Sequence, residues 1–472
     1  MSLNIVILGA GQVGSSLAEV LANENNDVTV VDLDRMQLQR LQDRLDIRTV
    51  WGHASHPDIL KQAGMDEADM LIAATQNDET NIVACNLAHI MFKTQKKIAR
   101  VRGRSYLEHP ELFDREQNTN AIAIDFLISP ETLVTDYILQ LIEYPGSLQV
   151  IDFLNGKLRM IAMKVMKDGL MVNTQISELS DHLPRDIRAR IVAIYRNKEA
   201  VMPTGDVIIE EGDEIFFLAE TRHLRSIIAE IRQRKEKPSR NIMIGGGGNI
   251  GYHLAKALEN DHQVKLVDHN IHQAREVAEK LDKTIVIHGD VSDRDLLTEE
   301  NIEEIDLFLA VTNNDEANII SGMLAKKLGV RRVIALVNNQ SYVELIQLNG
   351  IDVAISADSI TTSHLLHHSR QGDTVKAVTL RRGAAEAMEM VVHGSENTSE
   401  IIGKRLVDIP WPDDITVGAI IRNEEVIIAH RDTIIEAEDH VIFFLTDPNS
   451  ASKVAELFEV SQQSSWFNFG SN

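Results

Sequence analysis

A short apolar run followed by three regularly spaced glycines constrains the fold of this chain more than any other feature. The run Ile5–Leu8 precedes Gly9, Gly11 and Gly14. Four apolar residues in a row predict a strand buried on both faces of a parallel sheet. Gly9 permits a tight turn, Gly11 leaves room for a pyrophosphate, and Gly14 lets the next helix pack closely on the sheet. Phosphates would then lie at the free N–H groups of that helix.

A carboxylate completes the pattern. Asp32 ends the next apolar run, Val28–Val31. An acidic residue at this point accepts hydrogen bonds from the ribose of a bound nucleotide. Strand, glycines, helix, strand and Asp32 together predict a Rossmann-type domain, which three glycines alone would not. The predicted phosphate loop consists of Gly9, Ala10, Gly11, Gln12, Val13 and Gly14.

The same pattern occurs a second time in the chain. The run Ile242–Ile244 leads into a second glycine loop, and Asp268 closes the strand that follows. A long-period repeat dictates the architecture, so the chain is a duplication. The second predicted loop consists of Gly246, Gly247, Gly248, Asn249, Ile250 and Gly251.

The rest of the first half alternates predicted helices with predicted strands, as βαβ units do. We expect helices at 33–45, 59–63 and 81–88 and strands at 47–51, 70–74, 98–102 and 121–128. In such sheets a ligand binds beyond the carboxyl ends of the strands, where the strand order reverses. Thr75, Asn77 and Asp78 follow the fourth strand, so we expect them near the ligand.

Two arginines alternate along the predicted fifth strand. Arg100 and Arg102 flank Val101, so their side chains should share one face. One of them could bind the phosphates as a bidentate donor. The alternative is that both lie at the sheet edge with their charges in solvent.

A smaller domain follows each Rossmann half. Short strand-like runs separated by Gly-Asp turns fill the stretch from Gln149 to Ala219, and similar runs recur near the end of the chain. The fold class is therefore α/β: two tandem copies of a doubly wound parallel sheet, each followed by a small α+β domain. The predicted domains span 1–130, 145–232, 240–365 and 374–460.

Charge and composition exclude several classes of function. The formal net charge of −24 argues against nucleic-acid binding and against adhesion to an anionic membrane surface. The sequence contains no run of about 18 uncharged apolar residues, so we expect no direct insertion into a membrane. Cys85 is the only cysteine, which fits a reducing cytoplasm.

The tandem pattern resembles the regulator-of-potassium-conductance family (RCK, or KTN), in the duplicated form of bacterial Trk potassium uptake. The motif at Gly9–Gly14 and the repeated Thr-x-Asn-Asp-Glu-x-Asn at 75–81 and 312–318 carry the resemblance. It implies a regulatory subunit that binds NAD(H), ATP or ADP and gates a potassium channel or transporter by changing conformation. It further implies a homotetrameric ring under a membrane potassium-translocating subunit such as TrkH. The location would be the cytoplasm, at the inner face of the cell membrane.

By matching position, the resemblance implies further nucleotide contacts. They are His53, Thr75 and Arg100 in the first half and Asp290 and Thr312 in the second. The second half departs from the pattern, because Leu336 and Asn338 stand where Arg100 and Arg102 stand in the first. Without these cations, we expect the second site to hold polyphosphate less well.

An NAD-dependent oxidoreductase is the main alternative. It would need a proton donor or base beside the nicotinamide, usually on a separate substrate domain. The small domains offer no evident constellation of that kind, so we expect binding and no catalysis. Cys85 is expected to fill the core.

Two histidine groups have spacings that could hold a metal. His364, His367 and His368 share one helix face, but no carboxylate or cysteine completes a site there. His53 and His56 are replaced by Asp290 and Asp293 in the repeat. We therefore expect no metal site at either place.

Overall fold

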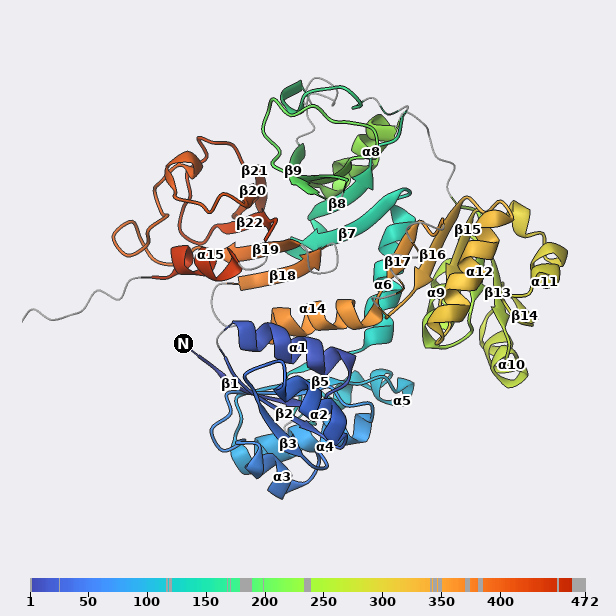
Figure 1. Cartoon of the computed structure of the whole chain (residues 1–472), viewed down its shortest axis with the longest axis horizontal. Helices are drawn as coiled ribbons and strands as arrows, with labels where there is room; N and C mark the ends of the chain where they lie inside the picture. Colours follow the sequence, from blue (N-terminus) through green and yellow to red (C-terminus); the bar gives the residue numbers. More distant parts are fainter. Residues whose placement is uncertain are drawn as a thin grey trace, which may run out of the picture. The chain divides into compact units, whose positions relative to one another are not determined.

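The computed structural model shows two compact units (Figure 1). One contains Met1–Glu143 and Lys237–Ser369, and the other contains Tyr144–Glu236 and Arg370–Asn472. The structure describes residues 2–24, 26–115, 118, 121–167, 169, 171–178, 189–197, 199–232, 239–339, 342, 346, 350–369, 374–380, 385–447 and 450–460. Within these ranges no helix is long and apolar enough to cross a lipid bilayer.

The first α/β domain has a six-stranded parallel sheet in the order β3-β2-β1-β4-β5-β6. The strand order reverses between β1 and β4, beside the first glycine loop, as a doubly wound fold requires. Its strands are β1 (Asn4–Leu8), β2 (Asp27–Asp32), β3 (Arg48–Trp51), β4 (Met70–Ala73), β5 (Lys96–Arg100) and β6 (Phe126–Ile128). Its helices are α1 (Gln12–Asn23), α2 (Arg35–Gln42), α3 (Pro57–Gln62), α4 (Asp78–Leu87) with a π-helical extension η1 (Ala88–Phe92), and α5 (Arg104–Leu107).

The second α/β domain repeats this order as β14-β13-β12-β15-β16-β17, again all parallel. The predicted duplication and fold class are confirmed. The strands are β12 (Asn241–Gly245), β13 (Gln263–Asp268), β14 (Ile285–His288), β15 (Leu307–Ala310), β16 (Arg332–Leu336) and β17 (Val353–Ile355). The helices are α9 (Asn249–Leu258), α10 (Ile271–Lys280), α11 (Arg294–Glu299) and α12 (Asp315–Lys327).

Two predicted strands were misplaced. The fifth strand spans 96–100 and not 98–102, because Lys97 is buried in it: its Nζ pairs with Asp125 at 2.7 Å and donates to two backbone carbonyls. The sixth strand begins at Phe126 and not at Ala121. The residues before it pair elsewhere, since the Ile122 N–H donates to the Leu112 carbonyl.

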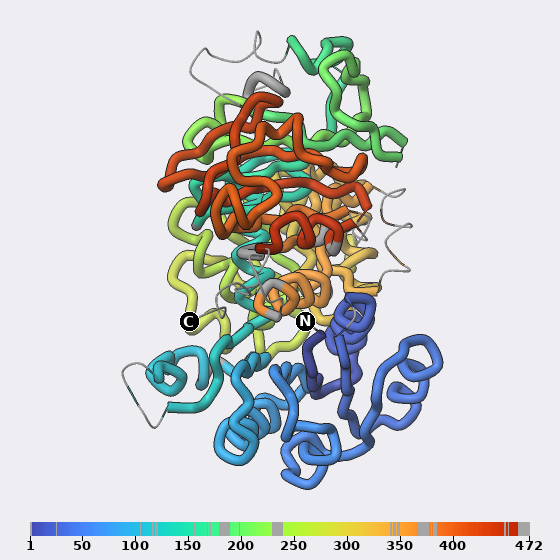
Figure 2. Tube along the Cα trace, turned by 90° about the vertical axis from the view of Figure 1, so that its left-hand side faces the viewer, coloured from blue at the N-terminus to red at the C-terminus, as the bar shows by residue number. Residues whose placement is uncertain are grey.

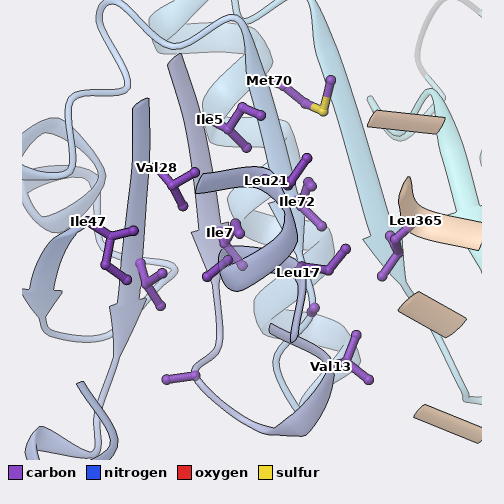
Figure 3. Packing of buried hydrophobic residues seen from close by; sticks show 14 of the residues in the cluster. Ile5, Ile7, Val13, Leu17, Leu21, Val28, Ile47, Met70, Ile72 and Leu365 are labelled. Atoms are coloured by element: carbon purple, nitrogen blue, oxygen red, sulfur yellow. The ribbon is translucent and has the colours of Figure 1, made fainter. Parts of the chain in front are cut away.

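The last helix of each α/β domain packs against the other domain. Helix α6 (Pro130–Glu143) follows β6 and contacts α9, whereas α14 (Ala357–Ser369) follows β17 and contacts α1 and α6. In Figure 1, α14 lies along α1. Leu365 and Leu366 of α14 are buried in the same cluster as Ile7 and Leu17, and Figure 3 shows Leu365 beside this cluster. Each α/β domain therefore includes a helix from the other half of the chain.

The second unit contains two five-stranded antiparallel sheets, ordered β10-β9-β11-β8-β7 and β18-β19-β22-β20-β21. They share one core, in which Phe216 and Phe444 lie with ring centroids 5.3 Å apart. Figure 2 follows the backbone of the second of these sheets in orange and red. Gly418 permits this close packing, because a Cβ there would lie 2.9 Å from the Leu218 and Val192 side chains. The elements are β7 (Ser147–Phe153), β8 (Leu158–Lys164), β9 (Ala189–Arg196), β10 (Glu199–Val201), β11 (Glu214–Glu220), α8 (Leu224–Arg232), β18 (Thr374–Leu380), β19 (Ala385–Val391), β20 (Ile415–Arg422), β21 (Glu425–Ile428), β22 (His440–Leu445) and α15 (Ala451–Phe458).

Candidate functional site

The first glycine loop has the geometry that its spacing predicts. Gly9 has a φ of 106°, a region that favours glycine, and its N–H donates to the Val31 carbonyl at 2.8 Å. A Cβ at Gly14 would lie only 1.9 Å from the Gly9 carbonyl oxygen, so α1 can approach the sheet only because this residue is glycine. Gly11 faces open space, since a Cβ at this residue would have no atom within 4 Å.

The amino end of α1 lacks a side-chain cap. Gly11 is the N-cap residue, and as a glycine it has no side chain that could accept a hydrogen bond from the first turn. The same is true of Gly248 at the start of α9, where a Cβ would also meet no atom. Unsatisfied N–H groups at a helix N-terminus attract anions, and the helix dipole adds to that attraction. This geometry fits the predicted role of both loops in binding phosphate.

The carboxylates of Asp32 and Asp268 hold the glycine loops in place. Asp32 accepts from the Ala10 N–H at 2.6 Å and from the Asp34 N–H at 2.7 Å. Asp268 makes the equivalent bonds with the Gly247 N–H at 2.6 Å and the Asn270 N–H at 2.8 Å. Each carboxylate oxygen has two lone pairs, so both residues retain acceptor capacity for ribose hydroxyls.

Arg100 is the last residue of β5 and is only 8% exposed. Its Nε is buried and has no hydrogen-bond partner in the part of the chain that the structure describes. A buried donor without a partner is costly, and a bound anion would satisfy it. This observation fits a phosphate-bearing ligand.

Arg102 lies beyond the end of β5, and the expectation that its side chain shares a face with that of Arg100 stays a prediction. The strand ends at Arg100, and the side chain of Arg102 pairs with Glu131, with Nε 3.7 Å from Oε1. The two-residue shift of β5 places Arg102 in the loop beyond the strand. Arg100 is the better candidate for a phosphate contact, because the side chain of Arg102 already faces a carboxylate.

A buried asparagine that the sequence reasoning missed joins the ends of β4 and β5. Asn81 is fully buried; its Oδ1 accepts from the N–H and the hydroxyl of Thr75, and its Nδ2 donates to the Arg100 carbonyl at 2.9 Å. Asn318 makes the same bonds with Thr312 and Leu336 in the second half. The repeated Thr-x-Asn-Asp-Glu-x-Asn motif was the available signal, because its last asparagine stands at the same place in both copies.

Replacing Asn81 tests whether this residue supports the site. We expect Asn81→Ala to lower the free energy of unfolding by about 2 kcal/mol, because it leaves several buried groups unpaired. It should also weaken ligand binding at the first loop, since Thr75 and Arg100 lose their shared anchor. Chemical denaturation and calorimetry measure the two effects. Asn318→Ala is the matched control and should spare first-site binding; unchanged stability and affinity in Asn81→Ala would contradict the assignment.

The other predicted site residues have structural partners of their own. Asn77 caps α4 by accepting from the Thr80 N–H at 2.7 Å. His53 lies 2.9 Å from the Ser55 hydroxyl, and its ring stacks on His56 at 4.9 Å between centroids. Asp290 accepts from the Ser292 N–H at 2.8 Å. These side chains shape the loops beside the sites, and their roles toward a nucleotide stay predictions.

The second site differs from the first in charge. Leu336, buried and apolar, occupies the position of Arg100. In addition, Gln273 Nε2 donates to the Gly247 carbonyl at 2.7 Å and ties α10 to the glycine loop. The second loop therefore keeps the backbone shape of the first without its buried cation.

The cysteine and histidine predictions concern other parts of the chain. Cys85 is fully buried, and burial raises the pKa of its thiol to about 12, so it fills the core as expected. Within the described ranges no group of three His, Cys, Asp or Glu side chains could hold a metal ion. His364 is exposed, and His368 stacks on Phe126 at 4.2 Å between ring centroids. The side chain of His367 lies outside the described part.

Comparison with known proteins identifies the family. The TrkA-N domain model matches residues 5–130 and 242–357, and the TrkA-C domain model matches 160–232 and 396–459. The "Trk system potassium uptake protein TrkA" of Halomonas elongata is 48% identical over 97% of this chain and 99% of its own length. The protein of the same name from Vibrio alginolyticus is 49% identical with the same coverage. The chain belongs to the TrkA family.

Solved structures support the same architecture. The RCK domain of GsuK aligns over 97% of this chain and 95% of its own, with a TM-score of 0.60 and 17% identity. At that identity the likeness concerns the fold alone. The resemblance drawn from the sequence is confirmed, and the link to potassium uptake holds at the level of the TrkA family. The expectation that the chain is not an enzyme agrees with membership in a family of transport proteins.

Proposed function

We propose that this protein is a nucleotide-sensing regulatory subunit that gates a potassium channel or transporter. The observation that carries the proposal is the first glycine-loop site, where the uncapped start of α1 and the unpartnered Nε of Arg100 both call for an anion. Gly11 leaves open space at that point, so a pyrophosphate can approach the backbone. Asp32 would hold the ribose.

The proposed ligands are NAD(H), ATP or ADP. They share a ribose for Asp32 and a di- or triphosphate for α1 and Arg100. A GsuK channel described as bound to NAD has the same fold, with a TM-score of 0.58 and 17% identity. That likeness supports the proposal without assigning a ligand to this chain. When bound, the nucleotide would bias two conformations through its differential affinity for them.

The proposed assembly is a homotetrameric ring under a TrkH-like membrane subunit, at the inner face of the cell membrane. Exposed apolar side chains on α4 and η1 support self-association: Ile90 is 72% exposed, and Val83 and Met91 are also exposed. Ile320 on α12 presents a similar side chain at the equivalent helix of the second half. Apolar side chains gathered on helices in this way are typical of protein–protein contacts.

Calorimetry with NADH, NAD, ATP and ADP on the full chain tests this function. We expect saturable binding to the first half and no turnover in an NADH absorbance assay across a panel of metabolites. Light scattering should give the mass of a tetramer. Reproducible turnover of NADH would favour an oxidoreductase, and the absence of any nucleotide binding would refute the sensor.

The carboxylate of Asp32 predicts a preference among nicotinamide nucleotides. A ribose 2′-phosphate would lie against this negative charge, so we expect NADH to bind at least tenfold more tightly than NADPH at the first site. Competition calorimetry measures the ratio. Asp32→Asn is the informative variant, because it should reduce the difference in affinity between NADH and NADPH. Equal affinity of the wild type for NADH and NADPH would contradict the role of Asp32.

A further inference from the structure

The crossing helices α6 and α14 begin at a group of charged side chains drawn from both halves. We call this group the crossing cluster; it consists of Asp78, Arg102, Glu131, Asp315 and Asp358. Glu131 lies in the first turn of α6 and Asp358 in the first turn of α14. Asp78 and Asp315 begin α4 and α12. Arg102 is thus a single cation among four carboxylates.

Two of the four carboxylates are satisfied by backbone groups. Asp78 Oδ2 accepts from the Arg102 N–H at 2.9 Å and from the Gly103 N–H at 2.6 Å. Asp315 Oδ2 does the same with Asn338 and Asn339, at 3.0 and 2.8 Å. These bonds are equivalent in the two halves, so they do not explain why the first half has an arginine at position 102.

The halves differ at the position of Arg102. In the second half Asn338 Oδ1 accepts from the Ala357 N–H at 2.9 Å and so caps α14. In the first half the residue that matches Ala357 is Pro130, which has no backbone N–H to donate to a capping side chain. Arg102 replaces the asparagine there and extends toward Glu131 instead.

The ion pair between Arg102 and Glu131 is incomplete. Arg102 Nε and Glu131 Oε2 are both buried without a hydrogen-bond partner in the described ranges. Burial raises the pKa of Glu131 and that of Asp358, and the positive charge of Arg102 lowers both. Asp78 and Asp315, the other charged groups near them, act to raise these pKa values. The geometry places both helices here: Arg102 faces Glu131 at the start of α6, and α14 packs on α6. Asp358 directly follows Ala357, whose N–H donates to Asn338, and the Asn338 N–H in turn donates to Asp315.

We propose that Arg102 is a shared counter-ion that positions α6 and α14 and couples them to the first glycine-loop site. Its backbone N–H is held by Asp78, which ends the loop that begins at Thr75 beside the site. Its guanidinium is attracted to Glu131 of the first half and to Asp358 of the second. A ligand that displaces the loop formed by residues 75–78 changes the position of Arg102. The attraction between Arg102 and the carboxylate of each helix then changes as well.

The first experiment needs no ligand. Hydrogen exchange of the full-length Arg102→Gln variant should be at least tenfold faster than wild type in peptides covering both α6 and α14. Arg102→Lys, which keeps the charge, should restore most of the protection. Arg44→Gln is the control, because Arg44 pairs with Glu19 on the surface at 3.3 Å and should change neither helix. Faster exchange in α6 alone, or in neither helix, would overturn the shared role.

The second experiment uses ADP and rests on the proposed function. Arg102→Gln should bind ADP within about threefold of wild type, whereas Arg100→Gln should lose at least tenfold. The change in α14 exchange that ADP produces should disappear in Arg102→Gln. An affinity loss equal to that of Arg100→Gln, or an unchanged α14 response, would show that Arg102 does not couple the site to the helices. If wild-type protein bound no ADP, the nucleotide function would fail, and the ligand-free experiment would still decide the structural claim.

Discussion

Gly11→Asp should abolish the tight phase of nucleotide binding while leaving the protein folded. A Cβ at Gly11 meets no atom within 4 Å, and the backbone there, at φ −68° and ψ −174°, suits any residue. The new carboxylate would face the incoming phosphate. Like charges about 4 Å apart repel by about 4 kcal/mol at an effective dielectric constant of about 20. Since about 1.4 kcal/mol is a tenfold change in affinity, we expect at least a hundredfold loss in isothermal titration.

Gly248→Asp is the matched control in the second half and should remove only a weak phase. The second site has Leu336 in place of Arg100, and a charge-assisted hydrogen bond contributes about 1.5–3 kcal/mol. A di- or triphosphate should thus fill the first site at concentrations that leave the second largely empty. If the tight phase survived Gly11→Asp and vanished with Gly248→Asp, the ranking of the two sites would be reversed.

Leu365→Ala should destabilise the first α/β domain although the residue belongs to the second half of the chain. Leu365 is fully buried among the side chains of β1 and α1. Truncating a buried leucine costs about 2–5 kcal/mol, through lost apolar burial and the cavity that remains. Hydrogen exchange resolved by peptide should be faster in β1 and α1, and this location assigns the loss of stability to the first α/β domain.

Leu33→Ala provides the comparison for that variant, because Leu33 is 61% exposed in the same domain and should change stability by less than about 0.5 kcal/mol. If exchange in β1 and α1 were as slow in Leu365→Ala as in wild type, helix α14 would not be part of the first domain's core.

The parallel sheets and the glycine loops could be predicted because their signals are local. Apolar runs such as Ile5–Leu8 are buried wherever they occur, and the glycine spacing meets steric demands that only glycine satisfies at Gly9 and Gly14. The start of β5 was missed because Lys96 and Lys97 look like solvent-exposed residues. Lys97 is buried only because Asp125, far along the chain, lies beside it.

The candidate site was predictable in its loops and only partly in its charges. The alternation of side chains along β5 cannot distinguish Arg100 from Arg102 when the strand is predicted to end two residues too late. Nor does an apolar stripe on a helix state which partner covers it. The packing of α6 and α14 on the opposite half depends on how the two α/β domains meet, which no local pattern encodes.

The internal exchange of helices has a consequence for how the duplicated halves can diverge. If two identical chains swapped this helix, every substitution would be present twice in the pair, once on each side. Here the partners are covalently joined, so each pair contains one half of each kind. A change such as arginine to asparagine at the position of Arg102 then affects one side only. Such a chain keeps one site with a cation and one neutral site in the same molecule. Each half also supplies a helix that stabilises the α/β domain of the other half.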